Sequence, residues 1–156
     1  MTGVQTCALP ILRVLTSRDE ETGAVMARQY WNSAYAGQVA FAASVPPAVS
    51  WSGDRTQFLG RNGTFSKPDA MGRARLDNRT GVGADPAAAL QVLLTLEPGD
   101  QTEVIFLLGQ TANVESMRSL IGRYQQPALV EAALTATRAW SGSAYSLRPR
   151  SARAGR

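Results

Sequence analysis

Carboxylates are the first side chains to consider for acid–base chemistry, because the 156 residues include 12 Asp and Glu but no histidine. General acid–base work needs two carboxyl groups in differently tuned environments. Asp19, Glu20 and Glu21 are consecutive in a predicted turn, which favours a solvated charge cluster. Four others stand at predicted loop positions, where aspartate commonly caps turns through its own backbone: Asp54, Asp69, Asp77 and Asp85. The spacing indicates no acid–base pair, so we assign no catalytic residue.

Metal and cofactor chemistry are not expected either. The absence of histidine removes the usual zinc sites. Cys7 is the single cysteine, so no internal disulfide can form, and no base lies near it in the sequence to activate its thiol. The glycine-rich stretch 81–84 is not a dinucleotide-binding fingerprint, because no strand-to-helix unit surrounds it. We therefore expect no metal ion and no cofactor.

Aromatic side chains could bind sugars, since flat rings stack on the apolar faces of pyranoses. The alternative is that these rings form the core of a sandwich or a face that once packed against another domain. The core is the favoured interpretation. The six side chains concerned are Tyr30, Trp31, Tyr35, Trp51, Phe58 and Phe65.

The formal charge of +4 suggests an anionic partner, but it is confined to one end. Residues 12–140 hold 12 basic and 12 acidic residues, whereas residues 141–156 hold four arginines and no acid. A short tail of this composition is typical of disorder more than of a nucleic-acid arm. We therefore expect no nucleic-acid partner. We also expect no membrane contact, because no uncharged apolar run reaches about 18 residues.

The first eleven residues, MTGVQTCALPI, are uncharged and lack the basic and apolar regions of a secretory signal. They resemble the translation of a sequencing-library adapter fused in frame, and we exclude them from the fold. The last sixteen residues lose all periodicity after Trp140, which a frameshift would explain.

Short apolar runs separated by turns dominate the body, a pattern typical of an antiparallel sheet protein. Strands are predicted at 12–16, 24–31, 38–44, 48–51, 87–96 and 102–108. Residues 54–71 are predicted to form a structured loop. Residues 97–100 (EPGD) suit a type II turn, so the last two strands are predicted to form a hairpin.

Helical spacing replaces the strand pattern after residue 110. Apolar residues recur from Val114 to Tyr124, with Asn113 or Thr111 as the predicted N-cap. Pro127 fits the first turn of a second helix, which is predicted to end at Trp140.

Several motifs occur in an order that resembles a known family. Residues 23–41, then DRTQFLGRNGT at 54–64, GVGADP at 81–86 and LEPG at 96–99 are similar to the β-supersandwich domain of glycoside hydrolase family 94. Within that family the motifs are most similar to the cyclic β-1,2-glucan synthases of Gram-negative bacteria. The resemblance covers roughly residues 18–140.

The resemblance implies a function that this chain would serve only in part. Family members are inverting phosphorylases or related modules that make or cleave β-glucosidic bonds with inorganic phosphate. Their acid and their phosphate-binding residues lie in an (α/α)6 barrel that follows the supersandwich, so no residue here inherits a catalytic role. By the same resemblance, the 54–65 loop is the part expected to contact glucan, with Arg61 and Asn62 as hydroxyl ligands and Trp51 as a stacking ring.

The sequence thus predicts a mainly β fold, an antiparallel β-sandwich (supersandwich) fragment followed by two C-terminal linker helices. We divide it into an adapter-derived segment (1–11), a partial supersandwich (12–110), linker helices (111–140) and a disordered, frameshifted tail (141–156). The expected function is a noncatalytic scaffold or carbohydrate-binding piece of a β-glucan enzyme; the alternative is a stand-alone carbohydrate-binding β-sandwich.

Expected partners are β-glucan and the barrel of the parent chain. The parent is expected to be bacterial, dimeric and associated with the inner membrane, with this module cytoplasmic. The piece alone is expected to be soluble or prone to aggregation.

Overall fold

The computed structural model describes residues 14–81 and 85–146. The predicted adapter segment 1–11 and the end of the predicted tail lie outside these residues. The chain divides into two compact units, residues 1–122 and 123–156. The elements of the first unit are β1 (Val14–Arg18), β2 (Val25–Gln29), β3 (Val39–Val45), β4 (Ser50–Asp54), α1 (Arg55–Leu59), the short helix η1 (Asp69–Gly72), β5 (Pro86–Gln91), β6 (Ile105–Thr111) and α2 (Val114–Arg123).

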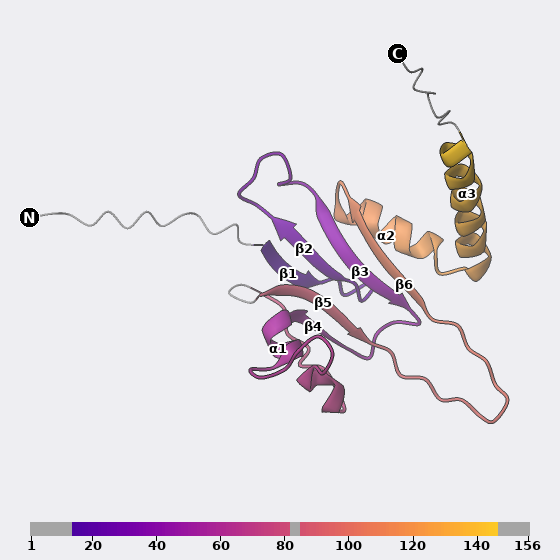
Figure 1. Cartoon of the computed structure of the whole chain (residues 1–156). Coiled ribbons are helices and arrows are strands. Elements are labelled where there is room, and N and C mark those ends of the chain that lie inside the picture. The colour runs from indigo at the N-terminus through magenta and orange to yellow at the C-terminus, as the bar shows by residue number, and fades with distance from the viewer. Residues whose placement is uncertain (1–13, 82–84, 147–156) are drawn as a thin grey trace, which may run out of the picture. The chain divides into compact units, whose positions relative to one another are not determined.

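Within the described residues, six strands form two antiparallel sheets (Figure 1). The larger sheet has the order β1-β2-β3-β6, and the smaller sheet pairs β4 with β5. The mainly β sandwich with C-terminal helices predicted from the sequence is therefore confirmed. Each of the predicted strands corresponds to an observed strand, with ends displaced by a few residues.

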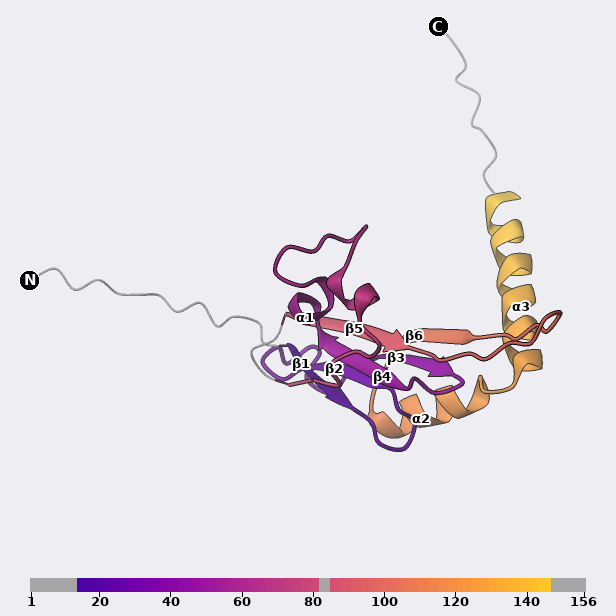
Figure 2. The same ribbon diagram turned by 90° about the horizontal axis from the view of Figure 1, so that it is seen from below.

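One face of the larger sheet carries the core of the first unit. Side chains alternate along a strand, so Met26, Val39, Phe41 and Ala43 share this face. The apolar stripe of α2, with Met117 and Ile121 fully buried, packs on them. Figure 2 shows α2 on one side of the strands and α1 with η1 on the other. Helix α2, which we predicted within the segment 111–140, thus forms part of the sheet unit.

The opposite face of the larger sheet approaches the smaller sheet through small and polar side chains. Thr16 of β1 lies against Gly53 of β4, where an added Cβ would lie 2.6 Å from Thr16 Oγ1. The same hydroxyl donates to the carbonyl of Gly53 at 3.4 Å and accepts from the amide of Gly81 at 3.1 Å. Close approach at this point therefore requires glycine at position 53.

The predicted hairpin between the last two strands is wrong. The turn itself exists, because the amide of Asp100 donates to the carbonyl of Glu97 at 3.0 Å and Gly99 has a φ of 95°. However, β5 pairs with β4 and β6 pairs with β3, in different sheets. A turn signal reports only a local reversal of the chain. The partner of β6 is fixed by packing, since the ring of Phe41 occupies the space beside Gly109, where a Cβ would lie 2.8 Å from Cε1 and Cζ.

The helices begin as the sequence predicts, but the second ends later. The side chain of Asn113 accepts from the amide of Ser116 at 2.8 Å, which caps the N-terminus of α2. In the second unit, α3 (Pro127–Ser146) begins at Pro127 and continues past Trp140 into the segment for which we expected no regular structure. Alanine and serine are tolerated in helices, a single glycine such as Gly142 only weakens one, and the next proline is Pro149. Among the described helices, none combines the length and the hydropathy needed to cross a bilayer.

The interpretation of residues 19–21 as a solvated cluster is wrong for Asp19, whose side chain is only 3% exposed. Its Oδ1 accepts from Nε and Nη2 of Arg118 at 3.0 and 2.6 Å, and its Oδ2 accepts from the amide and hydroxyl of Thr22 at 2.9 and 2.7 Å. Burial would raise the pKa of Asp19, but these hydrogen bonds outweigh burial and hold the pKa below its ordinary value. The carboxylate therefore joins the β1–β2 turn to α2.

Replacing Asp19 tests this link. We expect Asp19→Asn to lower the free energy of unfolding at pH 7 by about 1–2 kcal/mol, because charge-assisted hydrogen bonds to Arg118 are lost at a partly exposed partner. A carboxyl group with a lowered pKa contributes stability above its unfolded pKa, near about 4, and loses it as the pH falls through the folded value. The difference between the two proteins should thus shrink below about pH 4 in urea unfolding. The exposed neighbour offers the control Glu20→Gln, and an equal loss in that variant would contradict the assignment.

Replacing Gly53 tests the contact between the sheets. A Cβ at this position would meet Thr16 Oγ1 at 2.6 Å and both Thr16 Cβ and Thr80 Cγ2 at 3.0 Å. We expect Gly53→Ala to lower the free energy of unfolding by about 1–3 kcal/mol, measured by urea titration. Gly72→Ala is the matched control, because a Cβ there meets no atom within 4 Å. Equal effects of the two substitutions would show that β1 and β4 are not in close contact.

Candidate functional site

The segment 54–79, which we call the β4 lobe, contains the loop that the sequence indicates for ligand binding. It begins where the carboxylate of Asp54 accepts from the amide of Thr56 at 2.8 Å and so caps α1. Arg55 pairs with Asp85 at 2.5 Å, which ties the start of α1 to the segment entering β5. These contacts hold the helix at the end of β4.

Two glycines shape the turn that carries Arg61 and Asn62. Gly60 ends α1 with a φ of 79°, and a Cβ there would overlap the carboxylate of Asp69. A Cβ on Gly63 would overlap the carbonyl oxygen of Leu59. The turn therefore folds tightly back on α1 and η1, which gives its side chains a defined position.

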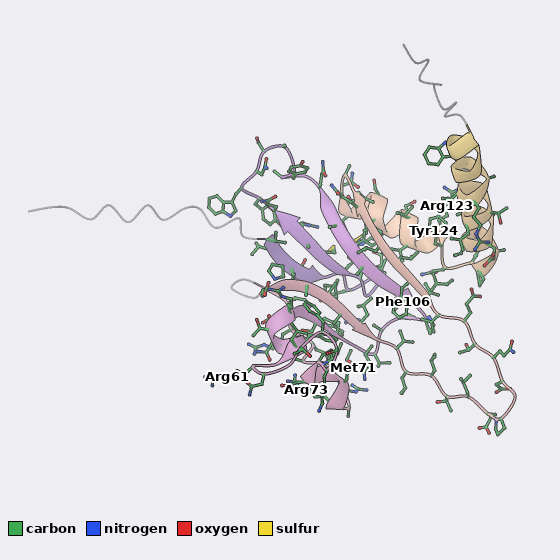
Figure 3. The ribbon with its side chains drawn as sticks, in the orientation of Figure 1. Arg61, Met71, Arg73, Phe106, Arg123 and Tyr124 are labelled. Atoms are coloured by element: carbon green, nitrogen blue, oxygen red, sulfur yellow. The ribbon has the colours of Figure 1, made fainter. Side chains whose placement is uncertain are left out.

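Arg61 and Asn62 are both exposed at this turn. Neither side chain makes a hydrogen bond or an ion pair within the part of the chain that the structure describes. Figure 3 places Arg61 on the β4 lobe together with Arg73 and Met71. The hydrogen-bonding groups of Arg61 and Asn62 are thus available to a ligand.

A buried hydroxyl group, that of Ser50, and the partly buried amide of Gln91 join the far end of the lobe to the smaller sheet. Ser50 Oγ, which is fully buried, accepts from the amide of Leu76 at 3.0 Å and also bonds the side-chain oxygen of Gln91. Gln91 Nε2 donates to the carbonyl of Ala74 at 3.1 Å, and Arg73 donates to the carbonyl of Gln57 at 3.2 Å. The lobe is thus held at both ends by the β4–β5 pair.

Trp51 lies in β4, but its ring is not free on both sides. The guanidinium carbon of Arg18 lies 3.5 Å from the ring centroid, in a cation–π contact between the two sheets. The side chain is half-buried, and no hydrogen bond or ring contact joins it to Arg61 or Asn62 in the described chain. Among the described residues, Trp51 is therefore not joined to Arg61 or Asn62, the other two predicted ligand-binding residues. Nothing in the sequence spacing between positions 18 and 51 indicated this pairing.

The lobe is basic although the body of the chain is neutral. Residues 54–79 include six basic and three acidic residues. Asp54 caps α1, and Arg55 pairs with Asp85. The exposed arginines include Arg61, Arg73 and Arg75. Such a surface can donate hydrogen bonds to hydroxyl or anionic groups of a ligand.

The carboxylates of the described residues do not gather into a cluster suited to a metal ion. Asp54 accepts a hydrogen bond from the backbone amide of Thr56. Asp19 accepts from the amide of Thr22 and pairs with Arg118. Within residues 14–81 and 85–146, no group of three or more Asp, Glu, Cys or His side chains lies close enough together to hold a metal ion. The carboxylates that have partners therefore support the fold.

A groove between the two sheets is apolar and does not suit a sugar. It has a volume of about 270 Å³, and small apolar side chains such as Ala27, Ala40 and Ala88 line it. Sugar hydroxyls would lose their hydrogen bonds to water there without gaining partners. The polar β4 lobe is the better candidate for a carbohydrate contact.

The favoured interpretation of the six aromatic residues as core is wrong for the four that are exposed. Trp31 is 70% exposed, and Tyr30, Tyr35 and Phe65 are also largely exposed. Phe58 and Trp51 are half-buried, and the aromatic residue in the apolar core is Phe41. The exposed rings are divided between the β2–β3 loop and the β4 lobe.

The chain is similar in sequence to two known proteins. Over 130 residues, or 83% of this chain, it is 32% identical to the cyclic beta-(1,2)-glucan synthase NdvB of Rhizobium meliloti (strain 1021). Over 73 residues, or 47% of this chain, it is 32% identical to the 3-O-beta-D-glucopyranosyl-beta-D-glucuronide phosphorylase of Paenibacillus borealis. The chain spans only 5% and 10% of the lengths of these two bacterial proteins.

The family assignment rests on a longer match. Residues 11–127, which include both sheets and α2, match the family described as "Glycosyl hydrolase 94, supersandwich domain". The order of motifs noted in the sequence, from residue 23 to residue 99, lies within this match. The chain therefore belongs to the glycosyl hydrolase 94 supersandwich domain family.

Proposed function

We propose that this chain is a noncatalytic supersandwich module of a bacterial protein that makes or processes β-glucan, and that its β4 lobe contacts the glucan. The observation that carries the proposal is the turn at 61–62. It presents an arginine and an asparagine without protein partners among the described residues, on a backbone held by Gly60 and Gly63. Both relatives have names that describe β-glucosidic chemistry, which supports glucan as the ligand class.

Trp51 contributes a smaller part of the proposed contact. Arg18 covers one face of its ring at 3.5 Å, so a sugar could stack only on the other face. The cation also fixes the orientation of the indole, which lowers the entropy lost on binding. We therefore assign the main polar contacts to Arg61 and Asn62, and a supporting role to Trp51.

Titration with β-1,2-glucan tests this proposal. We expect saturable changes in the amide NMR signals of residues 54–65 when linear β-1,2-glucan oligosaccharides are added. Each lost hydrogen bond is worth about 1 kcal/mol, so Arg61→Ala should weaken binding about fivefold. Arg75→Ala is the matched control, because Arg75 is an exposed arginine of the same lobe outside the turn.

Different results would separate the candidate functions. Equal loss of binding in Arg61→Ala and Arg75→Ala would indicate a diffuse charge effect and contradict the assigned site. Submicromolar binding by this chain alone would favour the stand-alone carbohydrate-binding module. If the same sample released a sugar phosphate when inorganic phosphate was added, the module would be catalytic, which would contradict the proposal.

We also propose that the catalytic barrel of the parent protein covers the β2–β3 loop. Tyr30, Trp31 and Tyr35 are exposed on this loop, and aromatic residues are enriched at protein interfaces. Hydroxyl-radical footprinting should find Trp31 reactive in this chain and protected in the full-length parent. Met71, which is 77% exposed on the β4 lobe, serves as the control and should stay reactive. Equal reactivity of Trp31 in both proteins would remove this interface.

A further inference from the structure

Asn62 differs from the other asparagines of the chain in having a free side chain. All the asparagines of the sequence lie among the described residues. In the other three, the side-chain oxygen accepts a hydrogen bond from a backbone amide at 2.8 to 3.0 Å, which holds the amide group in place: Asn32, Asn78 and Asn113. Asn62 is exposed and makes no hydrogen bond within the part of the chain that the structure describes. Its side-chain amide is thus free to rotate toward its own backbone.

The residue that follows Asn62 is a glycine, and the turn requires it. A Cβ at position 63 would overlap the carbonyl oxygen of Leu59, so a larger residue there would push the turn away from α1. The missing Cβ also leaves the backbone nitrogen of Gly63 open to approach from the Asn62 side chain. This nitrogen donates no hydrogen bond among the described residues. The steric constraint that shapes the turn therefore places a free amide nitrogen beside a free asparagine side chain.

We propose that Asn62 is a site of spontaneous deamidation. The backbone nitrogen of Gly63 loses its proton to a base in the solvent and attacks Cγ of Asn62. The new N–Cγ bond closes a succinimide ring, the bond from Cγ to the side-chain nitrogen breaks, and that nitrogen leaves as ammonia with a proton from the solvent. Water then opens the ring at either carbonyl and gives aspartate or isoaspartate. One water is consumed and one ammonia is released, and no oxidant, reductant or enzyme is needed.

The charge of the β4 lobe favours the first step. Residues 54–79 include six basic and three acidic residues, and Arg61 directly precedes the reacting asparagine. Cationic neighbours stabilise the negative charge that develops on the backbone nitrogen as its proton leaves. The carboxylate of Asp69, which lies beside Gly60, opposes this effect in part. The basic side chains outnumber it in the lobe.

Deamidation would change both the charge and the backbone of the turn. The product carries a carboxylate next to Arg61, so the net charge of the lobe falls by one. In isoaspartate the main chain also gains a methylene group, directly before the bridge in which the amides of Thr64 and Lys67 donate to each other's carbonyls at 3.3 and 3.1 Å. We expect this bridge to loosen in the isoaspartate form. The reaction depends on the turn alone and not on glucan binding.

Peptide mapping of the full 156-residue chain tests the proposal. The chain is aged under native conditions at mildly alkaline pH and digested with trypsin, which places Asn62 and Asn78 in separate peptides because it cleaves after Arg61 and Arg75. Asn78 is the matched control, since it is also exposed on the β4 lobe but its side chain accepts from the amide of Trp51 at 3.0 Å. Mass spectrometry should show Asn62 deamidating at least about tenfold faster than Asn78, a barrier lower by about 1.4 kcal/mol. The product should contain both isoaspartate and aspartate, the signature of a succinimide.

Ageing in urea separates the effect of the structure from that of the sequence. Because Asn62 has no hydrogen bond to lose, its rate should change by less than about fivefold on unfolding. Asn32 should react faster in urea than in the folded chain, since unfolding removes its bond from the amide of Ala34. Asn62→Gln provides a second control, because glutamine must close a larger ring and so reacts more slowly. This variant should lose the main acidic species on ion exchange, and circular dichroism checks that it is folded.

Three results would overturn the proposal. Asn62 could react less than tenfold faster than Asn78 in the folded chain. Its rate could rise more than fivefold in urea, which would show that the folded turn protects it. Lastly, Asn62→Gln could form the acidic species as fast as the unmodified chain, which would place the reaction at another residue.

Discussion

The contact between Thr16 and Gly53 is the constraint on which the arrangement of the first unit depends. It brings the backbone of β4 close enough for the Thr16 hydroxyl to bond the carbonyl of Gly53 and the amide of Gly81. The position of β4 sets the position of Asp54, and Asp54 starts α1. The turn at Arg61 and Asn62 follows from there, so the geometry of the candidate site is set by one close approach between the sheets.

The same constraint explains why we place the proposed glucan contact outside the space between the sheets. Sheets that meet through threonine, serine, glycine and alanine have little side-chain volume to fill the gap between them. What remains is an apolar groove lined by small residues, without the donors and acceptors that sugar hydroxyls require. Polar side chains lie instead on the β4 lobe, which the buried Ser50 and the partly buried Gln91 join to the smaller sheet. The packing between the sheets and the proposed ligand contact thus lie at different parts of β4.

The sequence was sufficient to predict what depends on local patterns. Strand positions, the Asn113 cap and the helical position of Pro127 all follow from period and capping preferences. The predictions that failed depended on contacts between distant segments. The EPGD turn exists, but steric fit between Phe41 and Gly109 determines the partner of β6. Asp19 lies in a charged turn, yet it is buried and accepts hydrogen bonds from Arg118, far along the chain. The contact of Arg18 with Trp51 is of the same kind, and it changes what Trp51 can do as a stacking ring.

The two faces of the larger sheet are covered to different extents. Helix α2 covers the face of Val39 and Phe41, with Met117 and Ile121 as the buried residues at the centre. This helix and β6 are consecutive, so a unit that ended before α2 would expose that core; the compact unit accordingly extends to Gly122. The other face is only partly covered, because the smaller sheet is held at β1 through Thr16 and leaves Phe106 and Leu108 exposed on β6. Apolar side chains that are neither packed nor interrupted by charge favour association.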